Sequence, residues 1–121
     1  MQQLRKKSRR GFRGYPLATI ALYGPTDQIA TKVAVGIILA DGADADELER
    51  WTVGRGDIRQ DATIEMEIVQ MLLRRGVRTV VMSPGIIGCP HEEGIDYPDG
   101  EACPTCPFWK GRDRWAGVDG V

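Results

Sequence analysis

The stretch DATIEMEIVQMLLRRGVRTVVM, residues 61–82, decides the fold, because it joins the clearest helix of the chain to a β-branched strand. Four apolar residues recur at the spacing of one helical face: Ile64, Ile68, Met71 and Leu72. This pattern predicts a helix over residues 62–75 with a broad buried face. Asp61 stands where its side chain accepts from the free amides of the first turn, and Gly76 is the expected left-handed terminator. Residues 77–82 then predict a strand.

Three shorter segments before this helix predict strands. Residues 17–23 are apolar and end at a Gly-Pro turn, residues 31–40 alternate large apolar with small or mixed side chains, and residues 48–53 alternate more weakly. Short connections predict an antiparallel meander. A helix between two strands normally makes a right-handed crossover to a parallel position, so the last strand should lie beside the first. The predicted fold class is α+β, a small mixed sheet in the order β-β-β-α-β.

This order of elements resembles the first half of a ribonuclease-H-like sheet. Nucleases of that kind carry a metal-binding acid on the first strand, and residues 17–23 contain none. Ser83 stands at the end of the last strand, so Glu65 and Glu67 of the helix have no matching carboxylate there. The resemblance therefore covers topology alone, and nuclease activity is not predicted.

All the cysteines and the single histidine fall within residues 88–109, GCPHEEGIDYPDGEACPTCPFW: they are Cys89, His91, Cys103 and Cys106. Three thiolates and one imidazole form the Cys₃His donor set of structural zinc sites. The Cys103-Pro-Thr-Cys106 pair resembles a zinc knuckle, whose turn points backbone amides at the first sulfur, although Pro107 departs from that pattern. We predict Zn²⁺ as a cofactor bound by these four residues, in a C-terminal zinc-binding loop module that follows the sheet.

Three other interpretations of this segment remain open: ordinary buried thiols, a redox Cys-x-x-Cys pair, and a zinc enzyme. His91 and Glu93 match H-x-E, and together with the Cys-x-x-Cys pair they resemble the zinc deaminase signature. That resemblance implies a hydrolase or deaminase that acts through Glu92 or Glu93. Only eleven residues, with glycine and proline among them, separate the two ligand pairs. This is too short for the strand that separates the two halves of the deaminase signature. Cys89 also adds a fourth ligand where a catalytic water would bind, so a structural site is the favoured interpretation.

Length and composition predict one domain with a tail. A chain of 121 residues with 42% hydrophobic residues suits one modest core. The apolar runs are too short to cross a bilayer, and no signal-peptide pattern follows the basic start. An odd number of cysteines argues against a secreted disulfide framework. We therefore expect a cytoplasmic protein with no membrane contact.

Charge is distributed unevenly along the chain. Six of the sixteen basic residues lie before residue 14, with no acid among residues 1–26: Arg5, Lys6, Lys7, Arg9, Arg10 and Arg13. A basic arm of this kind is typical of contact with nucleic acid or an acidic protein partner, and the alternative is a merely solubilising terminus. The aromatic and basic residues 109–115 are a second candidate for nucleic-acid contact.

The predicted organisation has three parts. Residues 1–14 form a disordered basic arm without a core residue, residues 15–83 form the α+β domain, and residues 84–121 form the zinc-binding segment and C-terminal tail. The acidic loop between the ligand pairs should be a solvated flap. The predicted function is that of a small zinc-binding adaptor or binding protein.

Overall fold

The strands form one mixed four-stranded sheet in the order β3-β2-β1-β4. In the computed structural model, which describes residues 1–110, the elements follow in this order: α1 (Gln2–Ser8), β1 (Leu17–Tyr23), β2 (Lys32–Ile38), β3 (Glu47–Thr52), the 3₁₀ turn η1 (Ile58–Gln60), α2 (Ala62–Arg74), β4 (Thr79–Ile86) and the 3₁₀ turn η2 (Pro107–Trp109). β2 pairs antiparallel with both β1 and β3, and β4 pairs parallel with β1. The predicted α+β class and the neighbouring first and last strands are confirmed, and α1 is an addition.

Helix α2 begins and ends where its sequence indicates. The Asp61 carboxylate accepts a hydrogen bond from the Ile64 amide at 2.9 Å, which satisfies a free donor of the first turn. The chain leaves the helix through Gly76 at φ +64°, the left-handed conformation that glycine adopts without strain. Ile68 and Met71 are buried, so the apolar face of α2 packs into the core.

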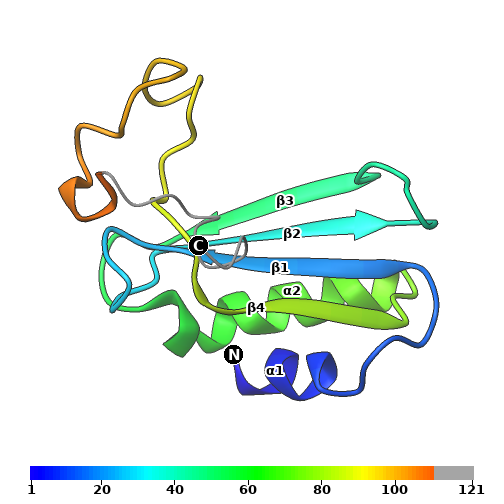
Figure 1. The fold of residues 1–121 in the computed structure, drawn as a ribbon. Helices are drawn as coiled ribbons and strands as arrows, with labels where there is room; N and C mark the ends of the chain where they lie inside the picture. Colours follow the sequence, from blue (N-terminus) through cyan, green and yellow to red (C-terminus); the bar gives the residue numbers. More distant parts are fainter. Residues whose placement is uncertain (111–121) are drawn as a thin grey trace.

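The two helices cover one face of the sheet (Figure 1). On that face, Ile20 of β1 stands opposite Val35 of β2, and both pack in one buried cluster with Ile68 of α2. The opposite face carries small residues such as Gly36 of β2 and half-exposed apolar ones such as Val81 of β4. The alternation predicted for the second strand therefore separates a covered face from an open one.

The last strand is longer than expected, because it continues past Met82 through a bulge. Ile20 pairs with Met82 and Leu22 with Ile86, so β4 gains two residues relative to β1. At the bulge, the Ser83 hydroxyl accepts from the Leu22 amide at 3.1 Å and donates to the Gly85 carbonyl at 2.8 Å. β4 lies at an edge of the sheet, where proline is tolerated, so Pro84 does not end it.

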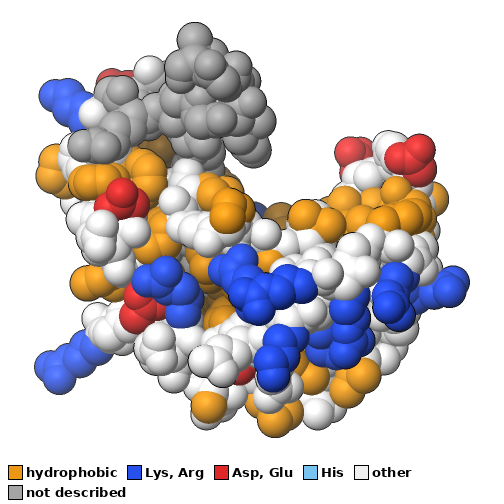
Figure 2. All heavy atoms as spheres, turned by 60° about the horizontal axis from the view of Figure 1, so that its bottom comes forward, with side chains coloured by type: hydrophobic (Ala, Val, Ile, Leu, Met, Phe, Trp, Pro, Cys, Tyr) orange, Lys and Arg blue, Asp and Glu red, His pale blue; other side chains and the backbone are white. Residues whose placement is uncertain are grey.

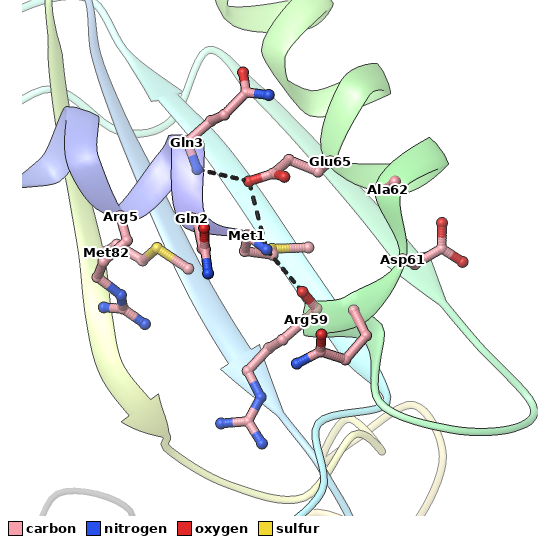
Figure 3. A pocket seen from close by; sticks show the side chains of 10 residues that line it. Met1, Gln2, Gln3, Arg5, Arg59, Asp61, Ala62, Glu65 and Met82 are labelled. Carbon is pink, nitrogen blue, oxygen red and sulfur yellow. Dashed lines mark hydrogen bonds and ion pairs between the residues drawn. The ribbon is translucent and has the colours of Figure 1, made fainter.

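The prediction of a disordered arm over residues 1–14 is wrong for its first part. Residues 2–8 form α1, and Leu4 has no exposed surface in the main core cluster. No side chain of α1 caps its own first turn. Instead, the Glu65 carboxylate of α2 accepts from the Gln3 amide at 3.1 Å and lies 3.5 Å from the Met1 amino group (Figure 3). The burial of Leu4 and the hydrogen bonds to the Glu65 carboxylate together order α1.

The basic start of the chain thus belongs to the folded body, whereas the cysteine segment stands apart from it. Residues 87–110 form an irregular loop that leaves the carboxyl end of β4, beyond the end of the sheet (Figure 1). Among the described residues, no helix has both the length and the apolar character needed to cross a membrane.

Candidate metal centre

The cysteine segment is joined to the sheet at the turn that follows β1. The Ile87 amide donates to the Leu22 carbonyl at 2.9 Å, which extends the parallel pairing of β4 with β1. The Gly24 amide donates to the Gly88 carbonyl at 2.9 Å, directly before Cys89. The sheet therefore fixes where the first ligand pair begins.

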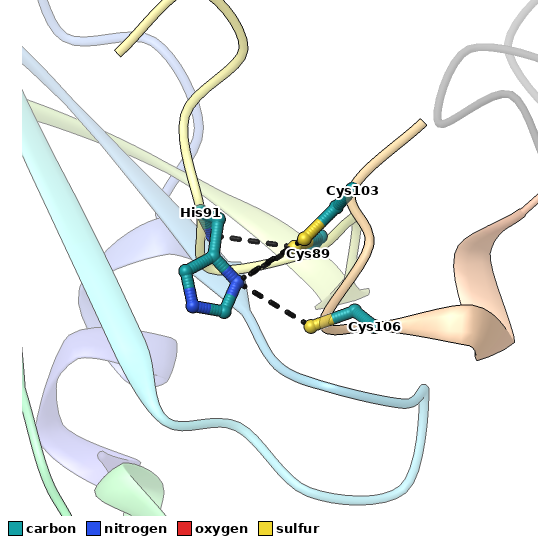
Figure 4. Close-up of side chains that lie close together, drawn as sticks. All are labelled: Cys89, His91, Cys103 and Cys106. Atoms are coloured by element: carbon teal, nitrogen blue, oxygen red, sulfur yellow. Dashed lines mark hydrogen bonds between the residues drawn. The ribbon is translucent and has the colours of Figure 1, made fainter. Parts of the chain in front are cut away.

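The structure brings the side chains of Cys89, His91, Cys103 and Cys106 together (Figure 4). The four donor atoms all lie within 4.8 Å of one another. The three sulfurs lie at 3.2, 3.4 and 3.5 Å from Nδ1 of His91, for Cys89, Cys103 and Cys106 in that order. No disulfide joins any of the three cysteines.

These distances match a coordination polyhedron better than a set of hydrogen bonds. An imidazole Nδ1 carries one proton or one lone pair, so it cannot satisfy three thiols at once. Zinc bonds of about 2.3 Å to sulfur and about 2.0–2.1 Å to nitrogen place neighbouring ligands of a tetrahedron about 3.5–3.8 Å apart. The three sulfur–nitrogen distances lie near this edge length. The donor set and its spacing therefore fit a tetrahedral metal ion.

Burial shapes the electrostatics of the site. The three cysteines are 3–8% exposed and pack with Tyr97 and Trp109 in a small cluster of their own. Burial raises the pKa of the Cys89 thiol to about 12, and burial also raises the pKa of Cys106. A cation among the sulfurs would offset this cost and favour the thiolates.

The Cys-x-x-Cys turn has the feature expected of a zinc knuckle. Burial opposes ionisation of Cys103 as well, yet its pKa is lowered because the backbone amides of Thr105 and Cys106 donate to its sulfur, with further hydrogen bonds from the neighbouring thiols. In the other half of the site, the His91 amide donates to the Cys89 sulfur at 3.3 Å. Pro107 supplies no amide and instead opens η2.

A buried lysine that the sequence analysis did not single out holds the site against the sheet. Lys32, at the start of β2, is 7% exposed. Its Nζ donates to the Pro90 carbonyl at 2.9 Å and to Glu92 Oε1 at 3.1 Å, and Arg50 of β3 donates to the same carboxylate oxygen. The Lys32 hydrogen bond, more than that of Arg50, lowers the pKa of Glu92. A charged residue opening an otherwise apolar strand is the signal that could have drawn attention to Lys32.

The expectation of a solvated acidic flap is therefore wrong for Glu92, whose carboxylate lies between two cations of the sheet. Glu93 is exposed, but its Oε2 accepts from the Gly100 amide at 2.7 Å. Within the same loop, the Asp96 carboxylate accepts from the Glu92 amide at 2.6 Å. Much of the acidic character of the loop is thus used to satisfy its own backbone donors.

Gly24 and Trp109 make a second join between the cysteine segment and the sheet. Trp109 Nε1 donates to the Gly24 carbonyl at 2.7 Å while its ring packs on the cysteines. A Cβ on Gly24 would stand 1.7 Å from the Ile29 carbonyl oxygen, so only glycine fits here. Trp109 thus covers the cysteine cluster, and the Phe108 ring packs against it edge to face, with ring centroids 5.0 Å apart.

A surface hollow of about 390 Å³ adjoins the site on the open face of the sheet. Cys89, His91, Glu92 and Glu93 line it together with Lys32. A second hollow of about 470 Å³ lies against His91 and Cys106. The imidazole is only partly buried between them.

The six basic residues predicted to contact nucleic acid lie far along the chain from this cluster, on α1 and the turn after it. Within residues 1–110, none of Arg5, Lys6, Lys7, Arg9, Arg10 and Arg13 takes part in an ion pair. Most of the alternative segment 109–115 lies outside the described residues.

Comparisons with protein-family models, with curated proteins and with solved structures each found no significant match. Function is accordingly inferred from the geometry of the chain itself.

Proposed function

We propose that this protein is a small zinc-stabilised binding protein whose Cys₃His site is structural. The observation that carries the proposal is the convergence of three buried sulfurs on one imidazole nitrogen at 3.2–3.5 Å. Zinc favours four tetrahedral sulfur and nitrogen ligands, and a site that supplies all four from the protein leaves no position for a catalytic water. The ion would hold residues 88–110 in place, as a core does elsewhere.

Metal analysis of the purified protein tests this proposal. We expect one equivalent of zinc per chain, and thiols that react with a disulfide reagent only after a strong chelator is added. Protein that contains no metal and titrates three free thiols in its native state would refute it. Glu93→Gln should retain both the zinc and the fold, because Glu93 is not one of the four proposed metal ligands.

The alternative is a zinc-dependent hydrolase or deaminase acting through Glu92 or Glu93, and the hollow beside His91 is the observation that favours it. The hydrogen bonds of the two carboxylates argue against this alternative, because Glu92 accepts from Lys32 and Glu93 accepts from the Gly100 amide. A hydrolytic activity that Glu93→Gln abolishes while zinc content stays unchanged would establish this alternative.

We further propose that the basic segment contacts nucleic acid, with an acidic protein as the other candidate partner. Within residues 1–110 these six cations have no carboxylate partner, and such a group of like charges favours an anionic ligand. Figure 2 shows a band of Lys and Arg side chains across the face that carries α1. Because Leu4 belongs to the core, these charges are held on a folded surface and not on a free arm.

Salt dependence of oligonucleotide binding tests this part. About four to six phosphate contacts predict a log–log slope of roughly −3 to −5. The triple variant Lys6→Gln/Arg9→Gln/Arg10→Gln removes three exposed charges and should weaken binding and flatten the slope by about 2. Arg55 follows β3, is exposed and forms no ion pair with another residue of the described part of the chain, so Arg55→Gln is the matched control. Binding that is equal in all three proteins, or absent at low salt, would contradict the proposal.

A further inference from the structure

An exposed aromatic ring lies near the end of the basic segment, residues 5–13. Phe12 is 67% exposed, although large apolar side chains are usually buried. It falls between Arg10 and Arg13 in the sequence, with both of these cations exposed as well. A solvated phenyl ring next to exposed guanidinium groups is the composition of surfaces that stack nucleic-acid bases.

The ring is carried by an ordered turn. Buried Thr79, the first residue of β4, accepts from the Arg13 amide at 2.8 Å and donates to the Gly14 carbonyl at 2.7 Å. The rings of Phe12 and Tyr15 meet edge to face, with centroids 5.4 Å apart and planes at 70°. These contacts hold Phe12 in place before any ligand arrives, which lowers the entropy cost of binding.

A further cation joins this surface from a distant part of the sequence. A Cβ on Gly14 would lie 3.5 Å from Nη1 of Arg78, so the Arg78 guanidinium packs over the turn that carries Phe12. Arg78 is exposed and forms no ion pair within the described residues. Cations therefore flank Phe12 in the sequence, at Arg10 and Arg13, and Arg78 joins the same turn from the residue that precedes β4.

We propose that Phe12, with Arg10, Arg13 and Arg78 around it, forms a stacking platform for an unpaired base, so that the basic surface selects single-stranded over double-stranded nucleic acid. The inference rests on the proposed nucleic-acid contact and deepens it. Phosphates of either form would meet the same cations, but bases within a duplex are stacked on each other and cannot reach the ring. Only a single strand gains from Phe12.

Fluorescence anisotropy with labelled oligouridylate of 20 nucleotides, and with an RNA duplex of equal total charge, tests the inference on the zinc-loaded full chain. We expect Phe12→Ala to weaken binding of the single strand by about tenfold and binding of the duplex by less than twofold. Phe12→Trp should retain the affinity for the single strand. Ile95→Ala, which removes a 75% exposed apolar side chain from the cysteine segment, is the matched control and should change neither.

The outcomes separate this inference from the function on which it rests. If Phe12→Ala binds oligouridylate as tightly as the parent while the triple charge variant does not, the stacking platform is wrong and the electrostatic contact stands. A parent protein that binds the duplex as tightly as the single strand also overturns the platform. If the parent binds neither RNA at low salt, the nucleic-acid contact itself fails.

Discussion

The sheet with its two helices and the cysteine segment are two regions stabilised in different ways. In the first, fifteen buried apolar side chains of the described residues form one cluster, contributed by α1, α2, η1, the β1–β2 turn and three of the four strands, β1, β2 and β4. In the second, the buried cluster consists of three cysteines with Tyr97 and Trp109 packed against it. The hydrophobic effect scales with buried apolar area, so it stabilises the first region and is too small to order the second alone. A metal ion held by the Cys₃His group, as proposed above, would supply what the second region lacks.

Removal of one ligand should have the largest effect and should fall on one region only. Loss of an outer partner already costs metal sites about 10–100-fold in affinity, so Cys103→Ser should cost more. We expect amide protection to be lost over residues 88–110 and retained in β1 and α2, as measured by hydrogen exchange. Chelation of the parent protein should reproduce the pattern, and added zinc should reverse it. Protection that persists throughout the cysteine segment would show that it folds without metal.

The next largest effect should fall on the other region. Leu4→Ala removes a fully buried side chain and should lower the free energy of unfolding by about 2–5 kcal/mol. Leu73→Ala, on α2 but 64% exposed, is the control and should change stability by less than about 0.5 kcal/mol. Urea denaturation measures both. Equal stability of the two variants would mean that α1 does not belong to the core.

Loss of the Lys32 contacts that connect the two regions should have an intermediate effect on the free energy of unfolding. Lys32→Met keeps the aliphatic stem but removes the donor to Pro90 and Glu92. It should cost about 1–3 kcal/mol, because the part-buried Pro90 carbonyl loses this donor and Glu92 loses one of its two cations. Arg50→Met removes the other partner of Glu92. The Arg50 side chain is 44% exposed, so its loss should cost less than about 1 kcal/mol. Urea denaturation of the zinc-loaded proteins ranks the two variants, and a larger loss for Arg50→Met would contradict this account.

The smallest effect concerns pH and the sheet region alone. The side-chain hydrogen bond from Arg59 lowers the pKa of Asp57 from 3.8 to about 2, and the carboxylate also accepts from the Ala30 amide. The unfolded chain therefore binds the proton first, so this stabilisation is present above about pH 4 and is lost as pH falls toward about 2. The difference in stability between metal-free parent and Asp57→Asn should shrink over that range. A difference that stays constant with pH would exclude the carboxylate as its source.

Local sequence patterns predicted the elements well where one short-range rule decides. The 3.6-residue spacing, Asp61 and Gly76 located α2 within one residue, because caps and periodicity act inside a single helix. Residues 17–23 were located without error for the same reason. The strand after α2 was predicted too short, since the continuation past Pro84 depends on a Ser83 side chain that bonds to β1.

The sequence alone determined the chemistry of the metal centre: soft donors of the right number, grouped in one segment poor in other means of folding. Only the tertiary structure decided that the four donors meet within 4.8 Å of one another, because this depends on Gly24, Lys32 and Trp109 holding the segment at the end of the sheet. The tertiary structure also decided that the basic N-terminal segment exposes most of its charges while it buries Leu4 in the core. Leu4 is one apolar residue among polar and charged ones, and its burial depends on core side chains and on the Glu65 carboxylate, which come from residues further along the chain. Such long-range partners leave no local periodicity, so no rule of short range could have predicted them.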